Sequence, residues 1–148
     1  MPQLYDDDGV RFTYPEDWAL SRDEQDREVT LTVSDEGASF WTLSLYTEQT
    51  PAEVVIETAV DAFREEYQEL DVYETDGSLC GFPVESRTIE FVCLELINTA
   101  VLQAFTTPGF TVLIYYQGTD HELVETRETL EKITRSLSLS VSLQSGAD

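Results

Sequence analysis

The sequence predicts an α/β (α+β) fold, a three-layer α/β/α sandwich in which a central antiparallel sheet of about six strands has a helix on each face. Residues 109–117 are an almost unbroken apolar run of strand length, with Pro108 before them and Gly118 after them. Because this run does not alternate with polar residues, both faces of its strand should be covered. Amphipathic segments at residues 50–70 and 119–137 supply the two helices, and alternating segments supply the other strands.

The N-terminal third is predicted to consist of strands joined by turns. Residues 10–14 alternate, and the turn that follows them carries Trp18. Residues 29–33 and 40–47 also alternate, whereas residues 22–28 form a highly charged hairpin tip. Residues 1–9 are predicted to be a mobile, acidic lead-in.

Capping signals define where the two helices should begin. Thr50 and Glu53 have the spacing of a capping box around Pro51, and Thr119 and Glu122 have the same spacing. The apolar stripes expected to be buried are Ile56, Val60, Phe63, Tyr67 and Leu70 in the first helix, and Leu123, Leu130, Ile133 and Leu137 in the second.

The middle of the chain is predicted to form strands at residues 72–75, 84–94 and 96–105, with breaks at residues 76–77 and 81–83. Residues 138–148 alternate serine with leucine or valine and then lose this pattern. They fit an edge strand or a loose tail, and we expect a tail. Without a repeat or a linker, residues 1–148 are expected to be one domain with a core at about residues 8–137.

The charge balance is extreme. The 148 residues include 30 acidic and 8 basic side chains, for a net charge of −22. Phosphate backbones and anionic lipid surfaces would be repelled, so nucleic-acid and membrane-surface binding are not expected. The acidity fits a surface that keeps the protein soluble, an adaptation to a salty milieu, or a face that binds a basic partner protein or weakly holds cations.

The cellular compartment can also be predicted. The N-terminus has neither the basic nor the apolar region of a signal peptide, and the apolar runs are shorter than a membrane span. A cytoplasmic location is therefore expected. The two cysteines, Cys80 and Cys93, lack a CxxC spacing and are expected to be reduced thiols.

Three local features resemble the PsbP-like superfamily. The first is residues 10–18, in which Tyr14, Pro15, two polar residues and Trp18 follow one another. The second is the glycine turn at residues 81–83, before a strand. The third is a tyrosine-bearing strand followed by a helix that closes at residues 133–137. The resemblance covers residues 8–137.

The resemblance implies a fold and a class of function. The superfamily includes PsbP extrinsic proteins of photosystem II, Mog-type proteins that bind the Ran GTPase, Eag-type chaperones of type VI secretion and bacterial domains of unknown function. It implies a non-catalytic, protein-binding accessory, adaptor or chaperone-like module. Mog-type proteins use an acidic surface, but no binding residue can be matched to this chain. A photosystem role is not expected, because no lumen-targeting leader precedes residue 1.

The sequence offers little for catalysis. His121 is the only histidine, which excludes multi-histidine metal sites. A nucleophilic triad would need His121 as its base, yet His121 lies in the first turn of a helix and no GxSxG motif is present. Phosphate loops and dinucleotide fingerprints are absent too. We therefore expect no enzymatic activity, no cofactor and no metal; residues 6–9 lack the spacing of a calcium loop.

The candidate binding site is a set of carboxylates that the first hairpin is expected to gather at one end. The set is Asp6, Asp7, Asp8, Glu16, Asp17, Asp23, Glu24 and Asp26. Phe40 and Tyr46 form either an apolar patch rimmed with acids or part of the core under a helix. Two alternatives remain open: a small-ligand or cation-binding domain, with its site where the helices meet the sheet or at the acidic end, and an enzyme with an unrecognised site that uses His121.

Overall fold

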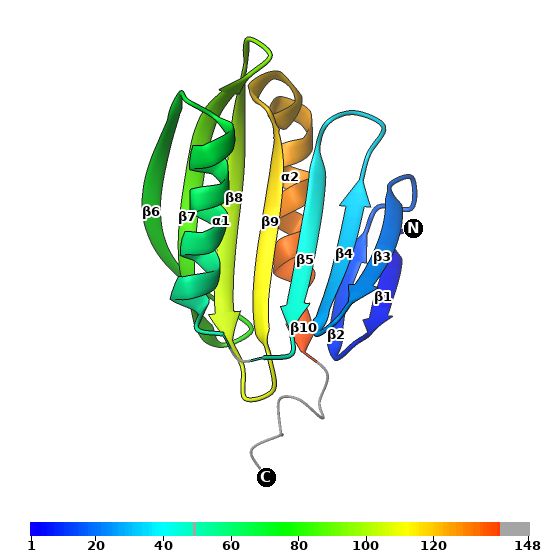
Figure 1. The fold of residues 1–148 in the computed structure, drawn as a ribbon. Helices are drawn as coiled ribbons and strands as arrows, with labels where there is room; N and C mark the ends of the chain where they lie inside the picture. The colour runs from blue at the N-terminus through cyan, green and yellow to red at the C-terminus, as the bar shows by residue number, and fades with distance from the viewer. Residues whose placement is uncertain (49, 140–148) are drawn as a thin grey trace.

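The computed structural model describes residues 1–48 and 50–139 and confirms the predicted fold class. A seven-stranded antiparallel sheet has the order β3-β4-β5-β9-β8-β7-β6, and a three-stranded sheet has the order β1-β2-β10 (Figure 1). The elements are β1 (Gln3–Asp7), β2 (Val10–Tyr14), β3 (Ala19–Gln25), β4 (Glu28–Ser34), β5 (Phe40–Tyr46), α1 (Ala52–Glu66), β6 (Leu70–Leu79), β7 (Phe82–Cys93), β8 (Leu96–Thr106), β9 (Thr111–Thr119), α2 (Asp120–Ser136) and β10 (Ser138–Leu139).

The two helices cover opposite faces of the large sheet (Figure 1). Strand β9 lies at the centre of the sheet, as its apolar sequence predicts. Its Val112 and Ile114 belong to the core under α2, whereas Leu113 and Tyr115 pack against the core under α1. The chain therefore has two hydrophobic cores, one on each side of β9.

The small sheet extends the layer that contains α2. Phe12 of β2 packs against Trp41 of β5, with ring centroids 4.8 Å apart, and both side chains are fully buried. The indole Nε1 of Trp41 donates a 2.9 Å hydrogen bond to Thr134 Oγ1 on α2. This contact joins the large sheet, the small sheet and α2 in one core.

One of the two predicted capping boxes is present. At the start of α2, Glu122 N donates to Thr119 Oγ1 over 3.2 Å, and Thr119 N donates to Glu122 Oε1 over 3.3 Å. The box predicted at Thr50 is wrong, because α1 begins at Ala52 after Pro51 and no side chain caps it. Helix α1 also ends at Glu66 rather than at residue 70, because Leu70 pairs with Phe91 in the sheet.

Four segments predicted to be irregular lie wholly or partly in strands instead. The acidic lead-in is β1, which pairs with β2 from Gln3 to Asp7, and Tyr5 stacks on Phe12. Most of the charged tip at residues 22–28 belongs to β3 and β4, and β6 continues through residues 76–77 to a turn at residues 80–81. Of the predicted tail, Ser138 and Leu139 pair with β2; residues 140–148 lie outside the described residues.

Candidate functional site

The predicted carboxylate set does not gather at one end of the first hairpin. Asp7 pairs with Val10 at the turn of this hairpin, whereas Gln3 pairs with Tyr14 at its other end. The acids at residues 6–8 therefore lie near the turn, and those at residues 16–17 follow the opposite end. The acids at residues 23–26 lie on β3 and its turn, and β3 is next to the first group because Arg22 contacts Asp8.

Several of these carboxylates already have cationic partners. Asp8 accepts hydrogen bonds from Arg22 Nε over 3.0 Å and from Arg22 Nη2 over 2.8 Å, and this guanidinium holds the pKa of Asp8 below its ordinary value. Tyr5 donates its hydroxyl to the same carboxylate. Asp6 pairs with Arg11 over 2.9 Å. This surface contributes negative potential, but Asp8, which bonds to both Arg22 and Tyr5, links β1 to β3.

A different surface combines apolar and acidic residues at the tip of the β7–β8 hairpin. The neighbouring strands end before this hairpin does: pairing with β6 stops at Phe91, and pairing with β9 stops at Asn98. Residues 92–97, which we call the hairpin tip, therefore project beyond the sheet at the top of Figure 1.

The hairpin tip exposes four large apolar side chains close together in sequence. Leu94 is 90% exposed, Leu96 55%, Ile97 51% and Val92 38%. Val92 and Ile97 are a cross-strand pair on one face of the hairpin, Leu96 pairs with Cys93 on the other face, and Leu94 lies in the turn. Single exposed apolar residues are common, but a group of them on one short projecting segment is typical of a binding surface.

Carboxylates surround the hairpin tip. Exposed Glu69, Asp71 and Glu90 line a hollow of about 430 Å³ beside Val92 and Ile97, and exposed Glu95 lies in the turn itself. No Lys or Arg lines this hollow. An apolar patch with an acidic rim is the surface that the sequence suggested at Phe40 and Tyr46, and the structure has one at the hairpin tip.

Phe40 and Tyr46 themselves belong to the interior beside α1. Phe40 packs edge-on against Tyr115, with ring centroids 5.2 Å apart, and Tyr46 packs against the α1 core. Both side chains are half-buried, and burial raises the pKa of the Tyr46 hydroxyl. The core interpretation of this pair is therefore confirmed.

The turn of the hairpin tip has an unusual backbone. Leu94 has φ 52° and Glu95 has φ 67°, both in the left-handed region. Two-residue turns of this kind favour Asn-Gly or Asp-Gly, and the β1–β2 turn uses Asp8-Gly9. A left-handed conformation costs a residue with a side chain about 1–2 kcal/mol. The chain thus holds an exposed leucine in a backbone conformation that leucine disfavours.

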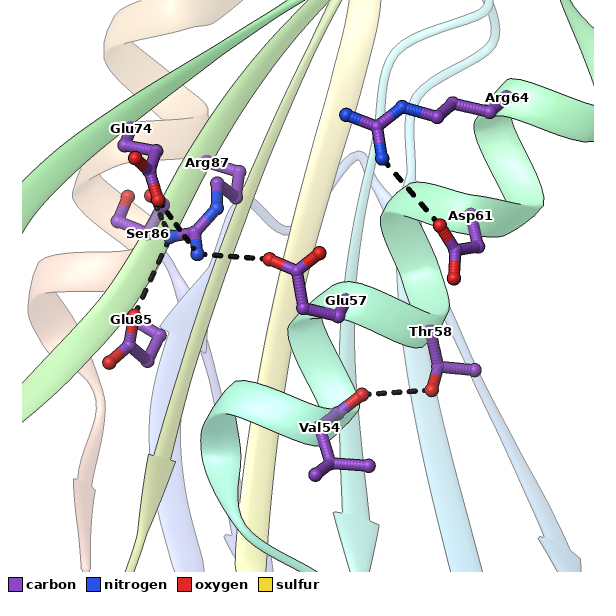
Figure 2. A network of polar contacts seen from close by, with 9 residues as sticks. All are labelled: Val54, Glu57, Thr58, Asp61, Arg64, Glu74, Glu85, Ser86 and Arg87. Atoms are coloured by element: carbon purple, nitrogen blue, oxygen red, sulfur yellow. Dashed lines mark hydrogen bonds and ion pairs between the residues drawn. The ribbon is translucent and has the colours of Figure 1, made fainter.

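A buried arginine forms the densest ionic cluster, shown in Figure 2. Arg87 of β7 is only 8% exposed, and its Nη2 lies 3.1 Å from both Glu57 of α1 and Glu74 of β6. Its Nη1 lies 3.5 Å from Glu85 and donates to the Ser86 carbonyl over 3.0 Å. Because Arg87 joins Glu57 of α1 and Glu74 of β6 to its own strand, we interpret the cluster as a structural link between α1 and the sheet.

His121 is the residue on which a nucleophilic triad would depend. His121 lies exposed in the first turn of α2, as predicted, and lines a shallow hollow with Asp35, Glu122 and Glu125. No group of three or more His, Cys, Asp or Glu residues suited to a metal ion occurs within residues 1–48 and 50–139. None of the helices in these ranges is long and apolar enough to span a membrane.

Comparison with known proteins shows that solved structures share this arrangement of strands and helices. No family model matches the chain, and no curated protein does. The solution structure of cyanobacterial PsbP (CyanoP) from Synechocystis sp. PCC 6803 superposes with a TM-score of 0.69 and 11% sequence identity, over 94% of this chain and 92% of that one. The fold is PsbP-like.

Two further structures share the PsbP-like fold with this chain. LpqN of Mycobacterium tuberculosis, which is involved in cell envelope biogenesis, gives a TM-score of 0.60 at 14% identity, over 95% of this chain and 90% of that one. PA94 of Pseudomonas aeruginosa is a protein of unknown function described as a putative regulator. It gives a TM-score of 0.57 at 10% identity, over 91% of this chain and 94% of that one. At these identities the likeness extends to the fold alone.

Proposed function

We propose that this protein is a non-catalytic accessory module that binds another protein through the hairpin tip. The observation that carries the proposal is the group of four exposed apolar side chains on a projecting, strained hairpin with an acidic rim. Docking would bury Leu94, Leu96 and Ile97, each worth about 1–2 kcal/mol given its present exposure. This gain gives a physical reason for keeping leucine in the turn.

The rim sets the chemistry of the partner. Glu69, Asp71, Glu90 and Glu95 would face basic side chains around an apolar cleft. The net charge of −22 would also speed the encounter with a basic protein at low salt. Among the described residues, four exposed acids of the first predicted set lack a cationic partner: Asp7, Asp17, Asp23 and Asp26. They would add to this long-range attraction rather than to the contact itself.

The proposal includes an adaptor or chaperone-like role in the cytoplasm. The PsbP-like fold supports a binding role in general terms, and two free thiols, Cys80 and Cys93, favour a reducing compartment. None of the structures compared above is a Mog-type protein, so that part of the resemblance contributes no residue to the proposed interface.

The proposal is tested by comparing baits in source-cell lysate. The first variant is Leu94→Ser, Leu96→Ser and Ile97→Thr. The matched control is Val54→Ser and Val124→Ser, because both valines are exposed and lie on the helices. We expect wild type and control to retain a discrete partner at low salt, and the tip variant to lose it. Equal capture by all three baits would contradict docking through the tip.

Two further baits distinguish acids that contact the partner directly from acids that attract it only at long range. Glu90→Gln with Glu95→Gln should weaken capture and flatten its salt dependence. Asp7→Asn, Asp17→Asn and Asp26→Asn should slow association and leave dissociation unchanged. A concentration-dependent dimer of purified protein that the tip variant abolishes would instead identify a second copy as the occupant, and would contradict a basic-rimmed partner.

A further inference from the structure

A second candidate site lies on the α2 side of the large sheet, away from the hairpin tip. Helix α2 packs mainly on β9 and β2, and also on β8 and β5, and leaves much of the same face of β6 and β7 without close contact to the helix. Between the helix and these strands is a cavity of about 280 Å³, which we call the α2 groove. Its lining residues are Thr75, Ser86, Thr88, Thr99, Val101, Gln103, Tyr116, Leu123, Arg127 and Glu131.

The floor of the α2 groove is polar and uncharged. Ser86 pairs with Thr75 on one side and with Gln103 on the other, so these side chains form a row across three strands. Thr75 Oγ1 donates to Ser86 Oγ over 2.9 Å, and Ser86 is only 4% exposed. A sheet face under a helix normally carries apolar residues, as the face under α2 does at Ile114.

Three side chains of the α2 groove have unused hydrogen-bonding capacity. Among the described residues, the Thr88 hydroxyl, the Gln103 amide and the Tyr116 hydroxyl form no side-chain hydrogen bond, although each residue is half-buried. Burial is also the main cause that raises the pKa of Tyr116 to about 12. No fully buried side-chain donor or acceptor in the described residues lacks a partner, so the polar atoms of these three side chains face the open cavity, where a ligand can reach them.

The charged residues that line the α2 groove limit the class of ligand that it could bind. Six of the eight basic side chains form ion pairs within the described ranges; Arg127 and Arg135 do not. Arg127 lies one turn before Glu131 on α2, and both line the α2 groove. Within the α2 groove the charge of Arg127 is matched by that of Glu131. An adjoining hollow adds Glu90, Asp120 and Glu128, so an anion would be repelled, whereas an uncharged ligand could bond to both Arg127 and Glu131.

We propose that the α2 groove binds one small uncharged molecule with several hydroxyl groups, of the monosaccharide or cyclic-polyol class. The guanidinium of Arg127 and the carboxylate of Glu131 suit neighbouring hydroxyls as donor fork and acceptor pair. Gln103, Thr88 and Tyr116 supply hydrogen bonds from the floor and side. The cavity is slightly smaller than most ligand sites, whose volumes begin at about 300 Å³. It would therefore hold a molecule with a single sugar-sized ring.

Saturation-transfer NMR on the full chain tests the proposal, with glucose, mannose and myo-inositol as probes at millimolar concentration. Glycine betaine and sodium acetate are the zwitterionic and anionic comparisons, because each carries C–H protons that can receive the transfer. We expect transfer to at least one polyol and none to the comparison compounds. No transfer to any of the three polyols, or transfer only to betaine or acetate, would overturn the assignment of the ligand class.

Three variants place the binding in the α2 groove. Tyr116→Phe, Gln103→Leu and Arg127→Met should each weaken polyol binding by about 3- to 10-fold or more, as expected for a lost hydrogen bond. Tyr46→Phe on the opposite face and Arg135→Met on the same helix are matched controls that should bind normally. Unfolding midpoints verify that each variant is folded. Wild-type affinity in all three groove variants would contradict a site here.

Discussion

At the scale of single residues, the core depends on one buried polar pair. Trp41 is fully buried, and its indole N–H reaches Thr134 Oγ1, which in turn donates to the Leu130 carbonyl. The alternation of residues 40–47 places Trp41 on one face of its strand together with Leu43 and Leu45. It does not predict the partner, because the two residues of the pair are 93 positions apart. Buried donors without a partner are costly, so this hydroxyl should matter more than its size suggests.

Thr134→Val removes the hydroxyl at nearly constant shape and leaves the Trp41 N–H unpaired. We expect the free energy of unfolding to fall by about 1–3 kcal/mol. Thr129→Val, on the same helix and without a hydrogen bond from its side chain in the described residues, is the control and should change stability much less. Urea denaturation of both variants measures the difference. Equal effects would show that the bond contributes nothing beyond helix propensity.

A second residue-scale prediction concerns pH. Glu122 accepts a 2.7 Å hydrogen bond from Ala38 N and bonds from Thr119, and these bonds, that from Ala38 first, lower its pKa below the ordinary 4.5. A carboxylate with a lowered folded-state pKa stabilises the protein above its unfolded pKa, and this contribution is lost as pH falls through the folded value.

Glu122→Gln should therefore destabilise the protein at neutral pH, by about 1 kcal/mol for a weakened cap. The difference from wild type should shrink below about pH 4, where the wild-type carboxylate is protonated. Glu125→Gln, exposed on the same helix, provides the comparison. A deficit that stays constant from neutral to acidic pH would mean that the charge of Glu122 plays no part.

At the scale of elements, the turn of the hairpin tip combines strain with exposure. Replacing Leu94 and Glu95 by Asn and Gly fits the left-handed backbone of both positions. We expect the double variant to gain about 1 kcal/mol in stability, because relief of strain outweighs the added flexibility of glycine. Urea denaturation measures this gain, and the lysate comparison should show lost capture. If the variant is more stable and still captures the partner, the strained turn is not needed for binding.

The same elements show why part of the fold is visible in sequence and part is not. Strand β9 and the start of α2 follow from local patterns: an unbroken apolar run, and the Thr119–Glu122 spacing. Strand β1 is hidden, because only Tyr5 of its five residues packs inward and its strand character comes from pairing with β2. Likewise Gly77 looks like a break, yet it lies within the edge strand β6.

The candidate surfaces were less predictable than the elements. The strands at residues 84–94 and 96–105 are confirmed to within two residues, but Leu94 and Glu95 carry no turn signal such as glycine or asparagine. The sequence therefore gives no sign that an apolar run leaves the sheet. The α2 groove depends on which strands α2 leaves uncovered, and this is a consequence of packing that no local pattern encodes.

At the scale of the whole molecule, the surplus of carboxylates opposes folding. With 30 acidic and 8 basic residues, and with six of the basic side chains paired in the described part, most acids repel one another in the compact state. Salt screens such repulsion over about 10 Å at 0.1 M and over shorter distances at higher concentration. Salt also screens the ion pairs, but most of these are exposed and contribute little to stability, apart from the cluster around Arg87.

We therefore expect the unfolding temperature to rise steadily from low salt to about 1 M NaCl, by about 2–4 °C for each kcal/mol of repulsion relieved.

Thermal melts in CaCl₂ at matched ionic strength distinguish screening of charges from specific binding of calcium. Equal curves in the two salts indicate screening alone. An excess effect of micromolar to low millimolar calcium would support the cation-binding alternative, since a bound ligand stabilises the folded state by mass action. A melting temperature that falls with NaCl would mean that the ion pairs outweigh the repulsion among the acids.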